Sequence, residues 1–80
     1  MDRMKVANYI SSNIKIVQTF VRMGRMPLSI MTDYDIYLFY KSIDYEPAQM
    51  KKYDIVSRHF KISVNTVRRA IVDMEKNINP

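Results

Sequence analysis

Apolar residues recur at helical spacing in the first third of the chain. They stand at positions 10, 14, 17 and 21, three or four residues apart, as on the buried face of an amphipathic helix. Gly24 and Pro27 come next, and both residue types are typical of the end of a helix. The pattern predicts a first helix over 8–23, while the polar run 11–13 is equally typical of a helix start.

The next segment is apolar or aromatic at nearly every position from 34 to 43. Thr32 can cap a helix there, and Asp33 and Asp35 in its first turn suit the positive end of the helix dipole. A helix that is apolar most of the way round has more surface to bury than one neighbour can cover. We therefore expect part of this helix to pair with a second copy of the chain. The residues expected in that dimer interface are Tyr37, Phe39 and Tyr40.

Two more helices are predicted after the break that ends at Pro47, a favourable first residue of a helix. The third helix covers 47–60 and the fourth 64–75, so that only residues 61–63 join them. Ser63 stands directly before the fourth helix, where its hydroxyl can accept a hydrogen bond from the first turn. Four residues remain after position 76, which is too few for a β-hairpin.

Length and composition narrow the fold class. Eighty residues make one domain, near the lower limit at which a single core supports itself. One glycine and three prolines are too few turn residues for a β fold. We expect an all-α domain over 1–80 with four helices, a two-helix unit at about 50–76 and no β wing. The helices of 8–43 then supply the core and the dimer contact.

The composition argues against an enzyme. The chain has no cysteine, one histidine and one glycine, so it lacks the residues for thiol chemistry, a histidine–cysteine metal site or a glycine-rich phosphate loop. No cofactor, metal or small-molecule ligand is indicated. The longest apolar stretch, 36–40, is too short to cross a bilayer, and no secretory signal is visible. Together with the absence of cysteine, this predicts a cytoplasmic protein without a membrane partner.

The net charge is +5, and it is unevenly distributed. Residues 1–27 carry a net charge of +4, residues 28–47 one of −3, and residues 48–80 one of +4. A basic segment beside an acidic middle suits a polyanionic partner. The positive charge of residues 48–80 therefore makes the two C-terminal helices a candidate surface for such a partner.

The fourth predicted helix has two different faces at about 100° per residue. One sector is apolar and comprises Val64, Val67, Ala70, Ile71 and Met74. The opposite side offers Asn65, Arg69, Val72 and Lys76, with Thr66 and Arg68 beside them. Arginine can read guanine, asparagine can read adenine, and an apolar group can contact the thymine methyl. Since two helices joined by so short a turn are typical of a helix-turn-helix, we predict base contacts to duplex DNA from Asn65, Arg69 and Arg68.

The segment Tyr53–Ile71 also resembles the helix-turn-helix of bacterial and phage regulators. Its part FKISVNTVRRAI is similar to the core of gluconate-repressor-type (GntR) transcription factors. The matching residues are Phe60, Ile62, Ser63, Thr66, Val67, Arg68, Ala70 and Ile71. Lys61 departs from the pattern, which prefers Gly at a turn position that is usually left-handed. Nothing in the chain matches the family's wing or effector domain.

The resemblance implies contacts from Ser63, Thr66 and Arg68 to the DNA backbone or nearby bases. Further basic residues around the third helix and the turn are candidates for phosphate contacts, which position a protein without reading sequence. These further candidates are Lys51, Lys52, Arg58, Lys61 and Lys76.

These features predict a homodimeric protein that binds duplex DNA with sequence preference, as a transcriptional regulator of a bacterium, phage or mobile element. One alternative is a DNA-binding accessory factor in replication, recombination or conjugation. Another is a protein-interaction adaptor, in which the helix-turn-helix core only presents a surface. The aromatic residues at 34–40 could also stack on single-stranded bases, but their acidic neighbours repel phosphate.

Overall fold

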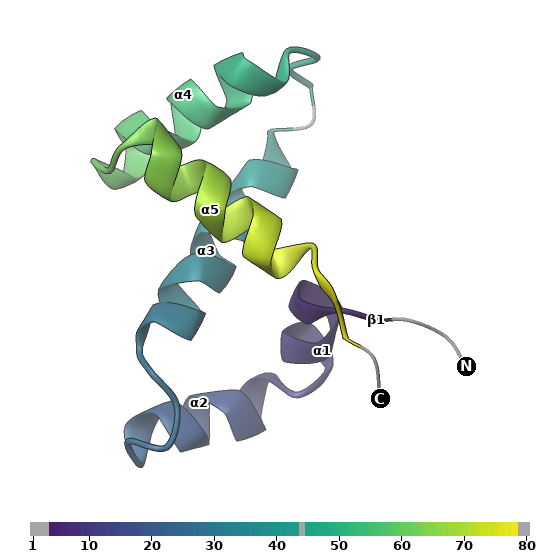
Figure 1. The fold of residues 1–80 in the computed structure, drawn as a ribbon, viewed down its shortest axis with the longest axis vertical. Coiled ribbons are helices and arrows are strands. Elements are labelled where there is room, and N and C mark those ends of the chain that lie inside the picture. The colour runs from purple at the N-terminus through teal and green to yellow at the C-terminus, as the bar shows by residue number, and fades with distance from the viewer. Residues whose placement is uncertain (1–3, 44, 79–80) are drawn as a thin grey trace.

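The computed structural model describes residues 4–43 and 45–78, and most of them are helical (Figure 1). In chain order the elements are β1 (Met4–Lys5), α1 (Val6–Ser12), α2 (Ile14–Arg22), α3 (Ser29–Ser42), α4 (Gln49–Phe60), α5 (Val64–Met74) and β2 (Asn77–Ile78). The predicted all-α class is confirmed, but the described residues form five helices where four were expected. No described helix is long and apolar enough to cross a membrane.

The additional helix comes from a break at Asn13, so the single helix expected over 8–23 is wrong. Asn13 has φ −127° and ψ 31°, outside the helical region. Its backbone N–H and its side-chain amide both donate to the carbonyl oxygen of Tyr9, at 3.1 and 2.9 Å. A side chain that bonds the preceding turn offers the backbone an alternative to continuing the helix. α1 therefore ends before Asn13, and α2 starts after it.

α2 ends where the sequence predicts, next to Gly24. This glycine has φ +74°, a left-handed conformation that residues with a side chain rarely adopt. Its N–H donates to the carbonyl oxygen of Val21 at 3.1 Å, and the N–H of Arg25 donates to that of Phe20 at 2.8 Å. These two hydrogen bonds form a Schellman motif, which closes the last helical turn.

α3 begins at Ser29, one turn before the predicted start. Thr32 therefore lies inside the helix rather than at its cap, and Asp33 falls outside the first turn. The helix starts soon after Pro27, whose carbonyl oxygen accepts a hydrogen bond from the N–H of Ile30 at 3.2 Å. Because Ile30 packs against the core, tertiary contact extends the helix toward the N-terminus.

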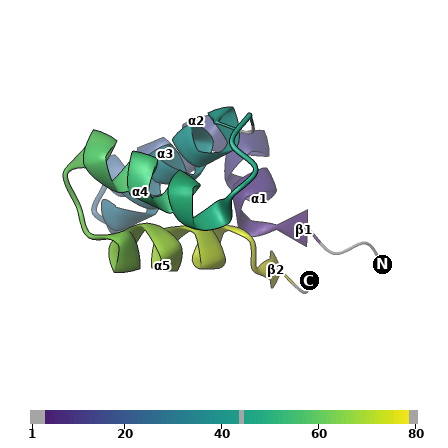
Figure 2. The same cartoon turned by 90° about the horizontal axis from the view of Figure 1, so that it is seen from above.

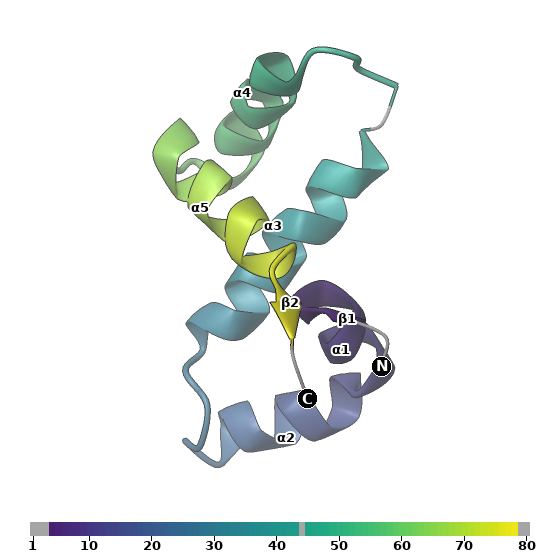
Figure 3. The same cartoon turned by 45° about the vertical axis from the view of Figure 1, so that its right-hand side comes forward.

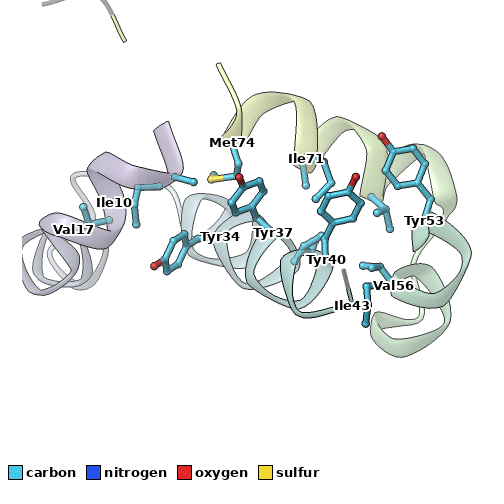
Figure 4. Packing of buried hydrophobic residues seen from close by; sticks show 14 residues of the cluster. Ile10, Val17, Tyr34, Tyr37, Tyr40, Ile43, Tyr53, Val56, Ile71 and Met74 are labelled. Atoms are coloured by element: carbon cyan, nitrogen blue, oxygen red, sulfur yellow. The ribbon is translucent and has the colours of Figure 1, made fainter. Parts of the chain in front are cut away.

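α3 lies at the centre of the molecule, with α4 and α5 packed on it and α1 near its other end (Figures 1 and 4). Tyr34, Tyr37 and Tyr40 of α3 are each only 8% exposed. Around them the core draws on every helix, with Ala7, Ile10, Val17, Ile36, Ile43, Tyr53, Val56, Val67, Ala70, Ile71 and Met74 also buried.

The dimer interface expected at Tyr37, Phe39 and Tyr40 is not an exposed patch. Tyr40 stacks on Tyr53 of α4 at 5.8 Å between ring centroids, and Tyr37 is buried in the same core. Phe39 is half-buried and stacks on His59 at 4.0 Å. α1, α4 and α5 all pack on α3, so most of its aromatic surface is buried within one chain. Leu38 remains as the one exposed large apolar side chain of α3.

α4 and α5 lie side by side and are joined by the short turn 61–63 (Figure 2). α4 begins at Gln49 rather than at Pro47, because Ala48 is extended and its N–H donates to Glu46 Oε1 at 3.1 Å. α5 begins at Val64, as predicted.

The first and last described segments meet in a short strand pair that the sequence did not predict (Figure 3). β1 and β2 are antiparallel, with Met4 opposite Ile78, and the N–H of Val6 donates to the carbonyl oxygen of Lys76 at 2.9 Å. The sequence predicted neither strand, because the partner of β2 comes from the opposite end of the chain rather than from a neighbouring segment. Within the described residues no β-hairpin follows α5.

Candidate nucleic-acid interface

α5 has the two faces that the sequence predicts. Its inner face packs on α3 and α4, and the side chains at most 3% exposed are Val67, Ala70, Ile71 and Met74. We define the outer face of α5 as its exposed residues, which are Asn65, Thr66, Arg68, Arg69 and Val72. The three predicted base-reading residues therefore share one accessible side of one helix.

Ser63 caps the start of α5, as predicted. Its Oγ accepts a hydrogen bond from the N–H of Thr66 at 3.1 Å, and the two hydroxyl oxygens lie 2.8 Å apart. The cap satisfies one of the N–H groups that a first helical turn leaves without a partner. Both residues are exposed at the end of the helix whose dipole favours an anion such as phosphate.

The turn before α5 holds Lys61 in a left-handed conformation, with φ 57° and ψ 46°. The N–H of Ile62 donates to the carbonyl oxygen of Ser57 at 3.0 Å and so closes the end of α4. A left-handed backbone costs a residue with a side chain about 1–2 kcal/mol. Phe60 and Ile62 are half-buried against the core, and their packing holds the strained lysine in place with its side chain exposed.

Arg68 and Asn65 lie together on the outer face of α5. Arg68 Nη2 donates a long hydrogen bond, 3.4 Å, to Asn65 Oδ1. In helix-turn-helix proteins the N-terminal residues of the second helix contact base edges. Asn65 lies in the first turn of α5, and Arg68 is the first residue after that turn. The pair is therefore near the N-terminal end of the helix, where such contacts are made.

Arg69 has acidic neighbours that the linear sequence does not reveal. Asp33 of α3 is half-buried, and its pKa is raised above the ordinary 3.8 by burial and then by the charge of Asp73, while the charge of Arg69 opposes the shift. Asp73 also forms an ion pair with Lys76 at 3.0 Å. An anion that approaches Arg69 therefore meets negative charge. This disfavours a phosphate contact more than a contact to a neutral base edge.

Gln49, at the start of α4, is a candidate that sequence reasoning missed. Its Nε2 donates to the hydroxyl oxygen of Tyr53 at 2.8 Å. The pKa of Tyr53 is raised above 10.0 by burial first and by Tyr40 second, and both the Gln49 hydrogen bond and the charge of Arg68 oppose this shift. The exposed Gln49 therefore lies beside Tyr53, whose hydroxyl is within electrostatic reach of Arg68. In the sequence, the only sign of this hydrogen bond was the spacing of four residues between Gln49 and Tyr53, which puts both on one side of a helix.

Three of the predicted phosphate contacts lie on α4. Lys51 is exposed, and the Nζ of Lys52 lies 5.0 Å above the ring of Tyr40. Arg58 forms an ion pair with Asp54 one turn away, at 3.1 Å, and the arginine side chain is largely exposed. Exposed ion pairs of this kind contribute little to stability, so Arg58 can exchange its carboxylate for a phosphate at small cost.

The other two basic residues predicted to contact phosphate, Lys61 and Lys76, lie beyond opposite ends of α5. Lys61 is beside the N-terminal end of the helix, next to Ser63. Lys76 follows the C-terminal end, where its side chain pairs with Asp73 and its carbonyl oxygen joins the strand pair. The structure therefore groups Lys61 with the start of α5 and separates Lys76 from it.

Comparison of the chain with known proteins found no matching family model, no matching curated protein and no matching solved structure. The resemblance to gluconate-repressor-type regulators is therefore carried only by the residues of the segment around the turn. The assignment of a function depends on the geometry of α4, the turn and α5.

Proposed function

We propose that this protein binds duplex DNA with sequence preference through a helix-turn-helix at about residues 50–76. α5 enters the major groove, and α4 and the turn lie against the sugar–phosphate backbone. The observation that carries this proposal is the outer face of α5. It offers an amide, two guanidinium groups and an exposed valine on one accessible side, directly behind a three-residue turn.

The dimensions and charges agree with this arrangement. α5 has 11 residues and is therefore about 16 Å long, and the major groove, about 12 Å wide, admits a helix. Asn65 and Arg68 contact base edges, with Arg69 beside them. Lys51, Lys52, Arg58 and Lys61 contact phosphates on either side, together with the hydroxyls of Ser63 and Thr66.

A cytoplasmic transcriptional regulator of a bacterium, phage or mobile element is the role that the sequence resemblance favours. An accessory factor of replication, recombination or conjugation would use the same face of α5 and differ in the DNA it organises. A protein-interaction adaptor would not need the outer face of α5 to meet DNA at all, so DNA binding separates it from the other two.

The test is selection of bound sequences from a pool of random duplexes, followed by titration of the enriched duplex and a scrambled one. We expect one sequence to be enriched. If about four phosphates are neutralised, its affinity falls about 100-fold between about 50 and 200 mM salt. The Arg25→Ala variant is the control for a general loss of positive charge, because it removes one exposed cation far from α5 in sequence. No enrichment together with salt-independent binding would reject the proposal and favour the adaptor.

A further inference from the structure

Tyr53, one turn into α4, carries a hydrogen-bond donor that the fold does not use. The residue is only 5% exposed, and Figure 4 shows its hydroxyl oxygen on the side of the ring away from Val56. This oxygen accepts a hydrogen bond from Nε2 of Gln49 at 2.8 Å. Within the described part of the chain no acceptor takes the hydroxyl hydrogen of Tyr53. Since a tyrosine hydroxyl can donate as well as accept, this hydrogen is available to an acceptor that reaches Gln49.

The start of α4 presents further donors beside Gln49, its first residue. The residue before it is Ala48, whose side chain cannot accept a hydrogen bond, and no acidic residue stands in the first turn. The N–H of Lys52 is the one that donates to the carbonyl oxygen of Ala48, at 3.1 Å. The N–H groups of 49–51 come earlier, where an α-helix has no internal acceptor to offer. The helix dipole favours an anion at this end.

The amide of Gln49 connects these two sets of donors. Its Nε2 carries two hydrogens, and one of them is used on Tyr53. Gln49 is exposed, so its second hydrogen is open to a ligand that approaches the end of the helix. One acceptor there can receive the amide of Gln49, the hydroxyl of Tyr53 and a backbone N–H together. An ionised oxygen is the acceptor that gains most, because hydrogen bonds to charged groups are about twice as strong as neutral ones.

The charges around Tyr53 leave room for an anion. Burial is the main cause that raises its pKa above 10.0, so the hydroxyl remains a donor at neutral pH. The charge of Glu75 also raises this pKa and that of Arg68 lowers it. Glu75 is paired with Lys5 at 3.5 Å, and Glu46 Oε1 accepts a backbone N–H at 3.1 Å, so both carboxylates are engaged. Arg68 donates to a neutral amide and keeps its charge available for a ligand.

We propose that Gln49, Tyr53 and the first N–H groups of α4 form a subsite for one phosphate of the DNA backbone. This inference rests on the proposed function, because the phosphate belongs to the duplex whose major groove receives α5. α4 and α5 are packed together, so a phosphate at the start of α4 lies beside the groove that α5 enters. The subsite positions α4 on one strand and so sets where Arg68 meets the base edges.

The neutral donors of this subsite give it a different signature from the lysines. A hydroxyl or an amide binds a phosphate without neutralising it, so its removal releases no fewer counterions. We expect Tyr53→Phe to lower affinity for the selected and scrambled duplexes alike by about tenfold and to leave the salt slope unchanged. Lys51→Ala, also at the start of α4, should instead reduce the salt slope by about 1.

Tyr34→Phe is the matched control, because Tyr34 is a similarly buried tyrosine of α3 toward the end of the core away from Tyr53 (Figure 4). It should bind DNA like the wild type. Urea unfolding of each variant shows whether the fold is intact. The exposed Gln49→Ala is the second variant, and it should also weaken all duplexes alike at an unchanged salt slope. Its loss and that of Tyr53→Phe should add to less than their sum, since both side chains contact the same phosphate.

The phosphate itself is identified with duplexes that carry one uncharged methylphosphonate at a time. We expect one position at which the modification weakens the wild type by about tenfold or more and weakens Tyr53→Phe much less. Equal losses for both proteins at every position, or a Tyr53→Phe variant that binds like the wild type, overturn the subsite and leave the proposed function standing. A wild type that binds no duplex overturns both. If inorganic phosphate shifts the ring signals of Tyr53 in nuclear magnetic resonance while the modified duplexes show no such position, the subsite belongs to a free anion and the DNA assignment is wrong.

Discussion

The Oγ of Ser63 accepts the N–H of Thr66 at 3.1 Å, and this contact sets the first residue of α5. Ser63 itself is extended, with ψ 155°, so the helix does not continue back into the turn. The turn stays three residues long because the cap ends it on one side and the left-handed Lys61 begins it on the other. The position of the outer face of α5 therefore depends both on the Ser63 cap and on the left-handed backbone of Lys61.

Replacing the cap should destabilise the fold. We expect Ser63→Ala to lower the free energy of unfolding by about 1 kcal/mol, because an N–H of the first turn loses its partner. Urea unfolding followed by circular dichroism measures the change. Ser63→Asp, which can also cap a helix, should restore the stability at neutral pH, and an alanine variant as stable as the wild type would show that the cap contributes nothing.

Relieving the strained turn should have the opposite effect. We expect Lys61→Gly to raise the free energy of unfolding by about 1 kcal/mol, because glycine adopts a left-handed backbone without the side-chain penalty. Lys61→Ala removes the same cation and keeps the penalty, so it is the control. Both variants should weaken binding to all duplexes alike. Equal stabilities of the two variants would contradict the account of strain.

Base-reading and phosphate-contacting residues should differ in their effect on specificity. We expect Arg68→Ala and Arg69→Ala each to lower affinity for the selected duplex by about 1–3 kcal/mol and to relax the base preference at one position. Lys52→Ala should weaken selected and scrambled duplexes equally and reduce the salt slope by about 1. Repeating the selection with each variant is the measurement. An unchanged selected sequence for Arg69→Ala would remove Arg69 from base readout.

The carboxylate of Asp33 should make stability depend on pH. Burial and then Asp73 raise its pKa above 3.8 despite Arg69, so the folded state binds this proton more tightly than the unfolded state. Its contribution to stability is therefore greatest at low pH and falls as the pH rises from about 3.8 through the raised pKa. We expect Asp33→Asn to be more stable than the wild type at neutral pH, with the difference shrinking toward pH 3.8.

Urea titrations of the wild type and the variant at a series of pH values test this expectation. Asp35→Asn, on the same helix but exposed, is the control and should change the stability at neutral pH much less. A loss of stability for Asp33→Asn at neutral pH would mean that attraction to Arg69 outweighs burial.

The parts of the fold that follow from neighbouring residues could be predicted. Ser63 as a cap, Gly24 as a helix end and the buried face of α5 each depend on a few adjacent positions and on the helical period. The break at Asn13 was only an alternative, because a polar run suits a helix start and a helix interior equally until packing chooses between them.

The sequence by itself determined the all-α class, the position of α5 and the set of residues on its outer face, because helical period and capping are local. Only the tertiary structure decided that Tyr37 and Tyr40 are buried in one chain, that Asp33 lies near Arg69, and that the strands β1 and β2 meet. Each of these depends on which distant elements pack together, and burial, pKa and strand pairing respond to those neighbours rather than to position along the chain.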